Sequence, residues 1–235
     1  MTAIFITATG TDVGKTFIAA SLIGHFRQMG RLVEAIKPVV SGFDLAQAAT
    51  SDPGVLLKAP GRPITAQEIE RISPWRFRAA LSPDLAARRE GRSIDVDNVI
   101  AFCQSAIERR QDMLLIEGVG GIMVPLDQHR TILDVMMTLR LPLILVTGSY
   151  LGTISHTLTA LDSLFRRDMN VLAIIVNETP GSTVPLDDTV AAISRFASPV
   201  IGVPRRRRDA GDPSAGVNLG GIFDPQRRRP PPRPD

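Results

Sequence analysis

The stretch from Thr9 to Thr16, which reads TGTDVGKT, has the composition of a loop that binds phosphate. It follows the apolar run 3–7 and leads into the apolar segment 17–26, so a strand, a loop of small residues and a helix are predicted in that order. Backbone N–H groups at the start of such a helix can bind phosphate oxygens, Lys15 adds a positive charge, and the Thr16 hydroxyl can bind Mg²⁺. The usual spacing has a Gly at position 9, where this chain has Thr.

Lysine is scarce in this chain, and its placement is informative. Among 27 Lys and Arg residues only Lys15, Lys37 and Lys58 are lysines, and the first two come directly after predicted strands. An ammonium is a compact charge on a flexible stem, which suits close contact with an oxyanion. Lys37, in the stretch AIKPVVSG, is therefore a candidate catalytic residue, the alternative being a strand-end lysine that points into solvent.

Carboxylates also stand at or near predicted strand ends. Glu117 ends the apolar run 113–117 and is followed by Gly118, Val119 and Gly120. A carboxylate there can hold the Mg²⁺ of a nucleotide, and the glycines allow the backbone to approach a ligand closely. Asp52 is a further candidate ligand, although it could equally cap a short helix.

Two later strand ends carry candidate binding residues. After the run 141–147, a helix is expected to start at Gly152, Thr153, Ile154 and Ser155, where free N–H groups could bind a carboxylate. An ordinary capped helix is the alternative. Asn177 ends the run 171–177 and offers both a donor and an acceptor to a nucleobase, or simply forms a turn.

These positions depend on an alternation of strands and helices. The apolar runs expected to form buried strands are 3–7, 32–40, 113–117, 141–147, 171–177 and 199–204. The expected helices are 15–29, 97–110, 131–140, 153–167 and 186–197. The alternation predicts one α/β domain with a parallel sheet and helices on both faces, in which ligands bind beyond the carboxyl ends of the strands. Segment 42–92 is expected to form loops with short helices.

The composition limits the classes of function. The chain has 235 residues, is 44% hydrophobic and has a net charge of +3. Segment 205–235 holds eight Arg and four Asp, an excess of +4, so the remaining residues carry 3 − 4 = −1. We expect this Arg/Pro-rich segment to be at least partly disordered and solvated, with no nucleic-acid or membrane partner. The single cysteine, Cys103, is expected to be a buried structural thiol in a cytoplasmic protein.

Taken in order, the motifs resemble those of the ATP-dependent dethiobiotin synthetase family. They are TGTDVGKT, KPVVSG, SDP, SPDLAA, EGVGGIMVPL, LGTISHTLTAL and VNE, within residues 2–204. The resemblance implies a P-loop synthetase domain over residues 1–204 that works as a homodimer. It also implies that 7,8-diaminononanoate, CO₂ and MgATP are converted into dethiobiotin, ADP and phosphate through a carbamate and a carbamic-phosphoric anhydride.

The resemblance also implies roles for matching residues. Lys37 would bind the carbamate, and Lys15 would bridge the carbamate and the phosphates. The ligands of Mg²⁺ would be Thr16, Asp52 and Glu117. The residues expected to contact ATP are Asp12, Val13, Gly14, Lys15, Thr16, Phe17, Asp52, Glu117, Gly118, Val119, Gly120, Asn177, Glu178, Pro204, Arg205 and Arg206. The residues expected to contact the diamine or its carbamate are Thr11 and Ser41, and those expected to bind its carboxylate, from the partner subunit, are Gly152, Thr153, Ile154 and Ser155.

The chain departs from the family pattern at three positions. Asp84 stands where the family has His, Tyr150 where many relatives have Lys, and Ser155 where some have Asn. The stretch RRRRDAGD also follows the last predicted strand, where the family contacts the nucleoside. The alternative function is a switch ATPase of the partitioning or septum-positioning type, whose loop carries an early lysine (KGGxGKT) that this chain lacks.

Overall fold

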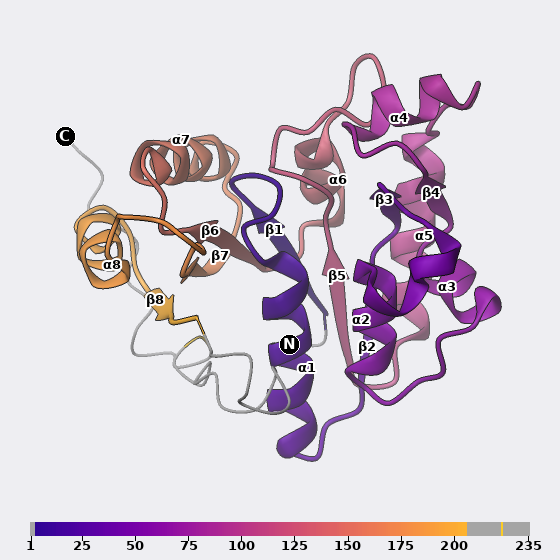
Figure 1. Cartoon of the computed structure of the whole chain (residues 1–235), viewed down its shortest axis with the longest axis horizontal. Helices are drawn as coiled ribbons and strands as arrows, with labels where there is room; N and C mark the ends of the chain where they lie inside the picture. The colour runs from indigo at the N-terminus through magenta and orange to yellow at the C-terminus, as the bar shows by residue number, and fades with distance from the viewer. Residues whose placement is uncertain (1–2, 206–221, 223–235) are drawn as a thin grey trace.

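The computed structural model describes residues 3–205 and residue 222 (Figure 1). Over these residues the main sheet has six strands in the order β2-β5-β1-β6-β7-β8. Every neighbouring pair is parallel. The strands are β1 (Ala3–Ala8), β2 (Val33–Ile36), β5 (Met113–Glu117), β6 (Leu143–Gly148), β7 (Val171–Asn177) and β8 (Val200–Val203). The predicted α/β fold with a parallel sheet is confirmed.

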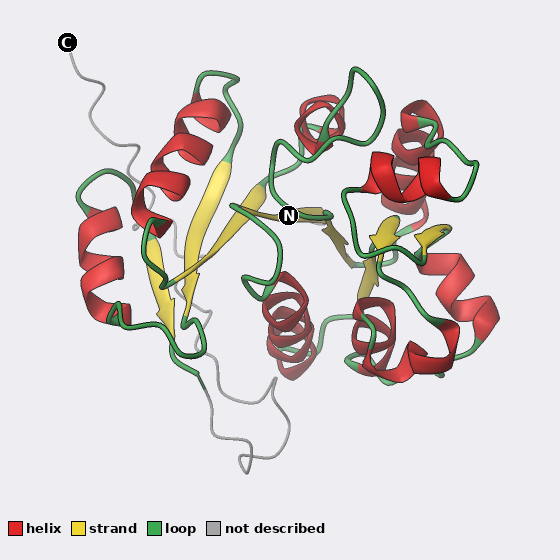
Figure 2. Cartoon of the chain, turned by 45° about the horizontal axis from the view of Figure 1, so that its top comes forward, coloured by secondary structure: helices red, strands yellow, loops and turns green. Residues whose placement is uncertain are grey.

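The apolar runs form strands because helices cover the sheet and exclude water from it (Figure 2). Every residue of β1, β5 and β6 is buried. The longer helices are α1 (Lys15–Gln28), α5 (Val96–Arg109), α6 (Ile132–Leu139), α7 (Thr153–Phe165) and α8 (Leu186–Ser194). All five lie within about three residues of the predicted bounds, the usual uncertainty of helix ends.

The predicted strand 32–40 is wrong as a single element. It is split at Lys37 and Pro38 into β2 and a second strand, β3 (Val39–Ser41). Pro38 has no N–H with which to continue the ladder, and the Lys37 N–H donates to the Ile72 carbonyl at 3.0 Å instead. Strand β3 pairs in parallel with β4 (Trp75–Phe77) in a separate two-stranded sheet. The chain therefore leaves the main sheet directly after β2 and turns Lys37 into the interior.

Segment 42–92 contains short helices joined by loops, as predicted, together with the unpredicted β4. The short helices are η1 (Leu45–Thr50), α2 (Asp52–Lys58), α3 (Ala66–Ile72) and α4 (Pro83–Arg89). Ser51 is the N-cap of α2, and its hydroxyl accepts a hydrogen bond from the Gly54 N–H at 3.3 Å. Because Ser51 fills this role, Asp52 is left in the first turn with its carboxylate available for another partner.

Two expectations about single residues can be compared with the core. Cys103 is 1% exposed in α5, and burial raises the pKa of its thiol to about 12, as expected of a structural cysteine. Ile222, from the Arg/Pro-rich segment, is fully buried in the hydrophobic core. The rest of that segment beyond Arg205, including Arg206, lies outside the described residues. No helix in the described ranges has both the length and the apolar character needed to cross a bilayer.

Candidate active site

Gly14 sets the shape of the phosphate loop where the chain enters α1. Its φ is +95°, a left-handed conformation that residues with a Cβ rarely adopt. A Cβ added here would lie 2.1 Å from Nδ2 of Asn177. That amide, at the end of β7, donates a hydrogen bond to the Val13 carbonyl at 3.2 Å. Asn177 therefore braces the loop, and Gly14 leaves the space that this contact requires.

Thr9, which stands where the usual spacing has Gly, attaches the loop to strand β6. Its N–H donates to the Val146 carbonyl at 3.0 Å, and its hydroxyl forms a 2.9 Å hydrogen bond with the Thr147 hydroxyl. The loop after β5, the other strand that pairs with β1, also approaches Thr9: a Cβ on Gly121 of that loop would lie 3.0 Å from the Thr9 carbonyl oxygen. The unusual entry residue thus holds the loop through its side chain.

Lys37 lies between two carboxylates at the carboxyl edge of the sheet. Its ammonium donates to Glu117 Oε1 at 2.7 Å and to Asp52 Oδ2. The Thr16 hydroxyl donates to the same Glu117 oxygen at 2.7 Å. The side chain of Lys37 is 4% exposed and that of Glu117 is 1% exposed, so the pair is dry. The residue that follows β2, the last residue of β5 and the first turns of α1 and α2 thus bring four side chains into a single cluster.

The protonation of the cluster follows from burial and charge. Burial opposes the charge on Lys37, but the carboxylates of Glu117 and Asp52 outweigh it and raise the pKa of Lys37. Burial likewise opposes ionisation of Asp52, and Lys37 reverses this and lowers the pKa of that carboxyl. Burial, and then the charge of Lys37, lower the pKa of Lys15 to about 8. The Lys15 ammonium donates to the Gly10 carbonyl at 2.9 Å. A polyanion bound beside it would raise the lowered pKa of Lys15 and favour its charged form.

A cavity of about 740 Å³ opens over this cluster. The predicted site residues that line it are Thr11, Asp12, Gly14, Lys15, Thr16, Lys37, Ser41, Asp52, Val119 and Gly120. Residues without a predicted role also line it: Val40, Gly42, Ala80, Leu81, Ser82, Pro83 and Val124. Most of these residues lie inside or beside the motifs KPVVSG, SPDLAA and EGVGGIMVPL. Their closeness to these motifs was the feature of the sequence that could have identified them as cavity residues. Asp84, which replaces the family's His, accepts a 2.6 Å hydrogen bond from the Ser82 hydroxyl in the first turn of α4.

The same cluster has the chemistry of a Mg²⁺ site. The second carboxylate oxygen of Glu117, Oε2, is buried without a hydrogen-bond partner, which is unusual for a charged group. Among the described residues no group of three or more His, Cys, Asp or Glu side chains could hold a metal. Mg²⁺, however, commonly uses one or two carboxylates and completes its shell with water and substrate phosphates. Asp52, Glu117 and the Thr16 hydroxyl fit that pattern.

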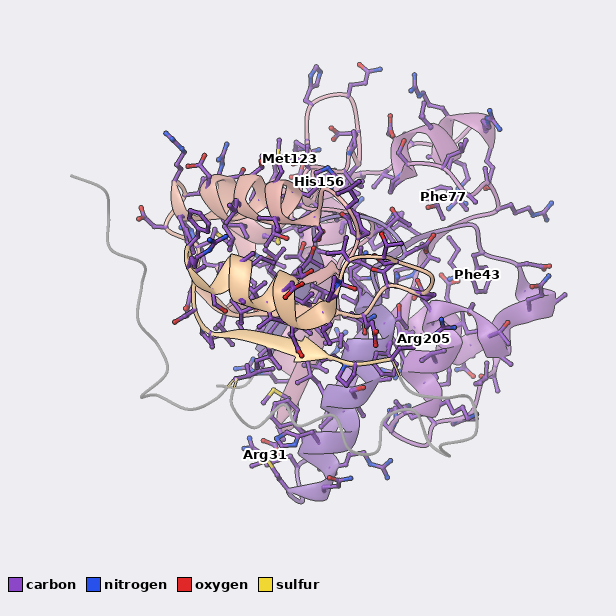
Figure 3. All side chains as sticks on the ribbon, turned by 60° about the vertical axis from the view of Figure 1, so that its left-hand side comes forward. Arg31, Phe43, Phe77, Met123, His156 and Arg205 are labelled. Carbon is purple, nitrogen blue, oxygen red and sulfur yellow. The ribbon has the colours of Figure 1, made fainter. Side chains whose placement is uncertain are left out.

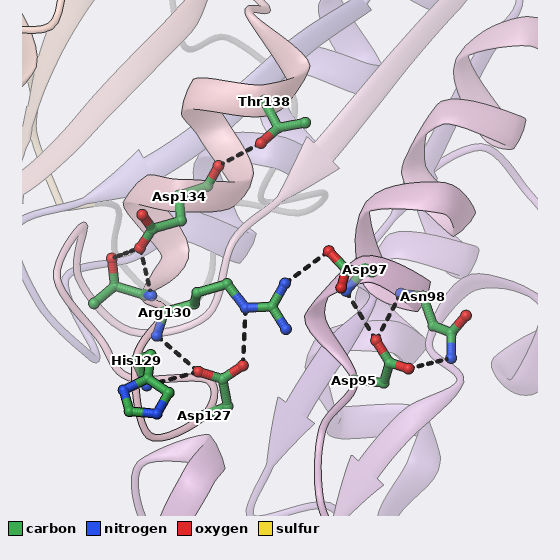
Figure 4. Close-up of polar contacts among 9 residues, drawn as sticks. Asp95, Asp97, Asn98, Asp127, His129, Arg130, Asp134 and Thr138 are labelled. Atoms are coloured by element: carbon green, nitrogen blue, oxygen red, sulfur yellow. Dashed lines mark hydrogen bonds and ion pairs between the residues drawn. The ribbon is translucent and has the colours of Figure 1, made fainter.

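The loop between β5 and α6, which brings Val119, Gly120 and Val124 to the cavity, is fixed at its far end by a polar cluster (Figure 4). Asp127 Oδ1 accepts hydrogen bonds from the N–H groups of His129 and Arg130 at 2.8 and 2.7 Å. The Arg130 guanidinium pairs with Asp127 at 3.0 Å and reaches Asp97 on α5 at 2.7 Å. A capping box of Thr131 and Asp134 then starts α6.

The predicted carboxylate-binding residues at the start of α7 do not line the cavity. Gly152 is the N-cap of α7 with a φ of +96°, and it is exposed together with Ser155. Thr153 is fully buried, and its N–H and hydroxyl donate to the carbonyls of Tyr150 and Gly148 at 3.0 and 2.6 Å. Thr153 thus shapes the turn, and the exposed start of the helix is not part of the lining of the chain's own Lys37 cavity.

The predicted nucleoside contacts lie at the ends of β7 and β8. Glu178 accepts a 2.6 Å hydrogen bond from the Arg205 N–H, and its own N–H donates to the Val203 carbonyl at 2.9 Å. Pro204 and Arg205 are exposed, and Figure 3 shows where Arg205 lies. These residues border the side of the loop on which Asn177 contacts Val13.

A second hollow, of about 800 Å³, contains none of the predicted site residues. Phe43 and Phe77, labelled in Figure 3, lie in its lining, but these residues are only 8% and 1% exposed. Two of its guanidinium groups are already paired, Arg76 with Glu70 and Arg92 with Glu90. The chemistry therefore belongs to the smaller cavity over Lys37.

Comparison with known proteins identifies relatives over most of the chain. A family model described as an AAA domain matches residues 2–208. The ATP-dependent dethiobiotin synthetase BioD of Methylobacterium nodulans is 42% identical over 224 residues, which cover 93% of this chain and 99% of that protein. The proteins of the same name from Acidiphilium cryptum and Caulobacter sp. (strain K31) are 44% and 45% identical, covering 83% and 87% of this chain and 88% and 89% of theirs.

Solved structures share the fold at low sequence identity. The MinC:MinD cell division complex of Aquifex aeolicus matches with a TM-score of 0.52 and 14% identity over 88% of this chain and 82% of that chain. The cell division ATPase MinD of Pyrococcus furiosus matches with a TM-score of 0.51 and 15% identity over 87% and 84%. At such identities the likeness shows the arrangement of strands and helices.

Gly14→Ala tests the shape of the loop. We expect ATP affinity to fall at least about tenfold, because a left-handed φ costs a residue with a Cβ roughly 1–2 kcal/mol and the new methyl group displaces Asn177. Isothermal titration calorimetry with ATP measures the change. Gly30→Ala is the matched control, since Gly30 has a φ of +75° and no atom within 4 Å of an added Cβ. Equal ATP affinity in the two variants would contradict the role given to Gly14.

Proposed function

The chain belongs to the family of ATP-dependent dethiobiotin synthetases, which are ligases of biotin biosynthesis, and we propose that the cluster around Lys37 performs the reaction. The proposed substrates are 7,8-diaminononanoate, CO₂ and ATP. One amine of the diamine adds to CO₂ and loses a proton, which gives a carbamate. A carbamate oxygen attacks the γ-phosphorus and ADP leaves. The second amine then attacks the carbonyl carbon of the mixed anhydride, expels phosphate and closes the ureido ring.

The position of Lys37 is the observation that supports this assignment best. A carbamate and a triphosphate are both anionic, and the enzyme must bring them together against their repulsion. Lys37 is held at the cavity by Glu117 and Asp52, with its pKa raised, so it stays cationic. A fixed charge in a water-excluded site stabilises the charge that develops in the transition state without reorganisation. We assign the carbamate to Lys37, and the contacts of the diamine to Thr11 and Ser41, which line the same cavity.

Lys15 and the loop are assigned to the phosphates. The loop N–H groups and the start of α1 favour bound anions, and Lys15 is almost buried beside them. With a pKa of about 8, Lys15 carries its charge in most molecules at neutral pH, and a bound triphosphate favours the charged form further. Lys15 thus neutralises oxygens shared between ATP and the carbamate.

Mg²⁺ is assigned to Thr16, Asp52 and Glu117. The orphaned Oε2 atom of Glu117 and the hydroxyl of Thr16 provide oxygen ligands of the kind that this ion prefers. When bound, Mg²⁺ neutralises charge on the transferred phosphoryl group. Lys37, whose carboxylate partners are then shared with a second cation, becomes available to the carbamate oxygen.

The remaining contacts complete the ATP site. Asn177 is proposed to bind the adenine edge, with Glu178, Pro204 and Arg205 beside the nucleoside. We propose residues 1–204 as the catalytic unit. We also assign the reaction to the cytoplasm, because it consumes ATP.

We further propose that the active enzyme is a homodimer in which the carboxylate of the diamine reaches the partner subunit. The start of α7 has a favourable dipole for an anion but lies outside the Lys37 cavity of its own chain. Next to it Leu151 is 89% exposed, so its apolar side chain is available for contact with a partner subunit. A two-fold axis would exchange the same contact in both directions.

Phosphate release tests the proposed function. The purified protein with MgATP and bicarbonate is expected to release phosphate only when 7,8-diaminononanoate is present, in equal amount to the dethiobiotin formed. A coupled phosphate assay and mass spectrometry of the product measure both. ATP hydrolysis without the diamine, stimulated by DNA or lipid, would instead support a switch ATPase and reject the synthetase assignment.

Lys37→Gln tests the catalytic assignment. We expect turnover to fall by at least about a hundredfold while ATP affinity stays within about threefold, because the amide keeps hydrogen bonding but supplies no charge to the carbamate. Lys58→Gln, at the exposed end of α2, is the matched control and should behave as wild type. Near-normal turnover by Lys37→Gln would refute the role given to this lysine.

Subunit complementation tests the dimer. Ser155→Glu places a negative charge where the carboxylate is expected, so this variant and Lys37→Gln should each be inactive. Random exchange between the two makes about half of the dimers mixed, and each mixed dimer has one intact site, so about a quarter of wild-type activity should return. Activity is measured before and after mixing under conditions that allow exchange. No gain, with exchange verified by differently tagged subunits, would show that each site is made within one chain.

A further inference from the structure

Four threonine hydroxyl groups form a chain from the phosphate loop to the first turns of α7. Thr147, on β6, is central: its Oγ1 lies 2.9 Å from that of Thr9, 2.8 Å from that of Thr153 and 3.0 Å from that of Thr157. Thr147, Thr153 and Thr157 are all fully buried. None of the roles assigned above uses Thr147.

The protons in this chain have one consistent direction. Thr153 donates to the Gly148 carbonyl at 2.6 Å, and Thr157 donates to the Thr153 carbonyl at 2.7 Å. A carbonyl can only accept and a hydroxyl has one proton, so the Thr153 proton is committed to Gly148. The Thr157 proton is shared, because this hydroxyl also donates to the Thr147 hydroxyl at 3.0 Å. Thr147 must then donate to Thr153 for their 2.8 Å contact to be a hydrogen bond. The remaining bond requires Thr9 to donate to Thr147.

This direction makes Thr147 the acceptor that fixes the first residue of the loop. Strand β1 ends at Ala8, which is opposite Val146 in register, so the hydroxyl bond continues the pairing of β1 with β6 by one residue. The next residue, Gly10, supplies the carbonyl that holds the Lys15 ammonium at 2.9 Å. A shift of Thr9 is therefore passed on to the anchor of Lys15.

We propose that Thr147 is a positioning residue that holds the phosphate loop, and with it Lys15, in the geometry that binds and activates ATP. Through Thr153, the same hydroxyl ties the loop to the turn that starts α7. The phosphate loop and the start of α7 are thus both hydrogen-bonded to the buried Thr147 hydroxyl. The inference rests on the proposed ATP site and adds a residue outside that site to its machinery.

Three variants test this positioning role. Thr147→Val keeps the shape of the side chain and removes the acceptor, while Thr153 and Thr157 keep their carbonyl partners. Thr147→Ser restores the hydroxyl with one methyl group fewer. Thr189→Val is the matched control, because Thr189 is also fully buried and its hydroxyl donates to the carbonyl of Pro185, the N-cap residue of its own helix, α8. Each is assayed for turnover, for ATP affinity by calorimetry without the diamine, and for thermal unfolding.

We expect Thr147→Val to lose about three- to tenfold in kcat/KM for ATP, the size of one net hydrogen bond, with a comparable loss of ATP affinity. Thr147→Ser should recover most of it. Thr189→Val should match wild type in both measurements. ATP affinity in Thr147→Val equal to wild type, or losses in Thr189→Val as large as in Thr147→Val, would overturn the inference. A wild-type protein that binds ATP but ignores the diamine would reject the proposed reaction and leave this affinity test valid.

Discussion

The ion pair between Lys37 and Glu117 is buried at the carboxyl edge of the sheet, and the arrangement of the site depends on it. The two residues follow Ile36 and Ile116, which are partners in the parallel pairing of β2 with β5. The sheet order therefore places an ammonium beside a carboxylate as soon as each strand ends. Loss of one partner from a buried pair leaves an uncompensated charge and typically costs about 3–5 kcal/mol. The same pair that orients Lys37 therefore also constrains which residues can end these two strands.

The phosphate loop is also held in a fixed geometry, but by hydrogen bonds and backbone conformation and not by an ion pair. Gly14 supplies the left-handed backbone and the space that Asn177 requires, whereas position 9 has lost the usual glycine and gained a hydroxyl. Thr9 uses this hydroxyl to bond to β6, so the loop is held from its entry by a side chain and from β7 by an amide. Rigidity at the entry and conformational freedom at Gly14 are therefore provided by different residues, at opposite ends of the loop.

The sequence was sufficient for the strands of the main sheet and for the residues at their ends, because buried parallel strands leave continuous apolar runs and their carboxyl ends meet at one edge. It was not sufficient where tertiary contacts decide. The run 32–40 has apolar residues on both sides of Pro38, and the partner that the Lys37 N–H finds at the Ile72 carbonyl shows that the chain leaves the main sheet there. Strand β4 is three residues long, too short for a periodic signal, and the cavity residues Ala80–Pro83 are positioned by its pairing with β3. The motif SPDLAA includes Ser82 and Pro83, but no role in the site was predicted for any of these four residues.

The structural likeness to MinD and the sequence likeness to dethiobiotin synthetases answer different questions. A parallel sheet with a loop before α1 can serve a switch or a synthetase, and at 14–15% identity only this common frame is shared. The proposed reaction adds a requirement to this frame, because a second anion must approach the phosphates. In that proposal the cation for the second anion is Lys37, which reaches the cavity because the chain leaves β2 at Pro38, directly behind it. By ending β2 at the edge of the sheet, Pro38 thus places an ammonium beside Glu117 and Asp52, where the proposed reaction requires one.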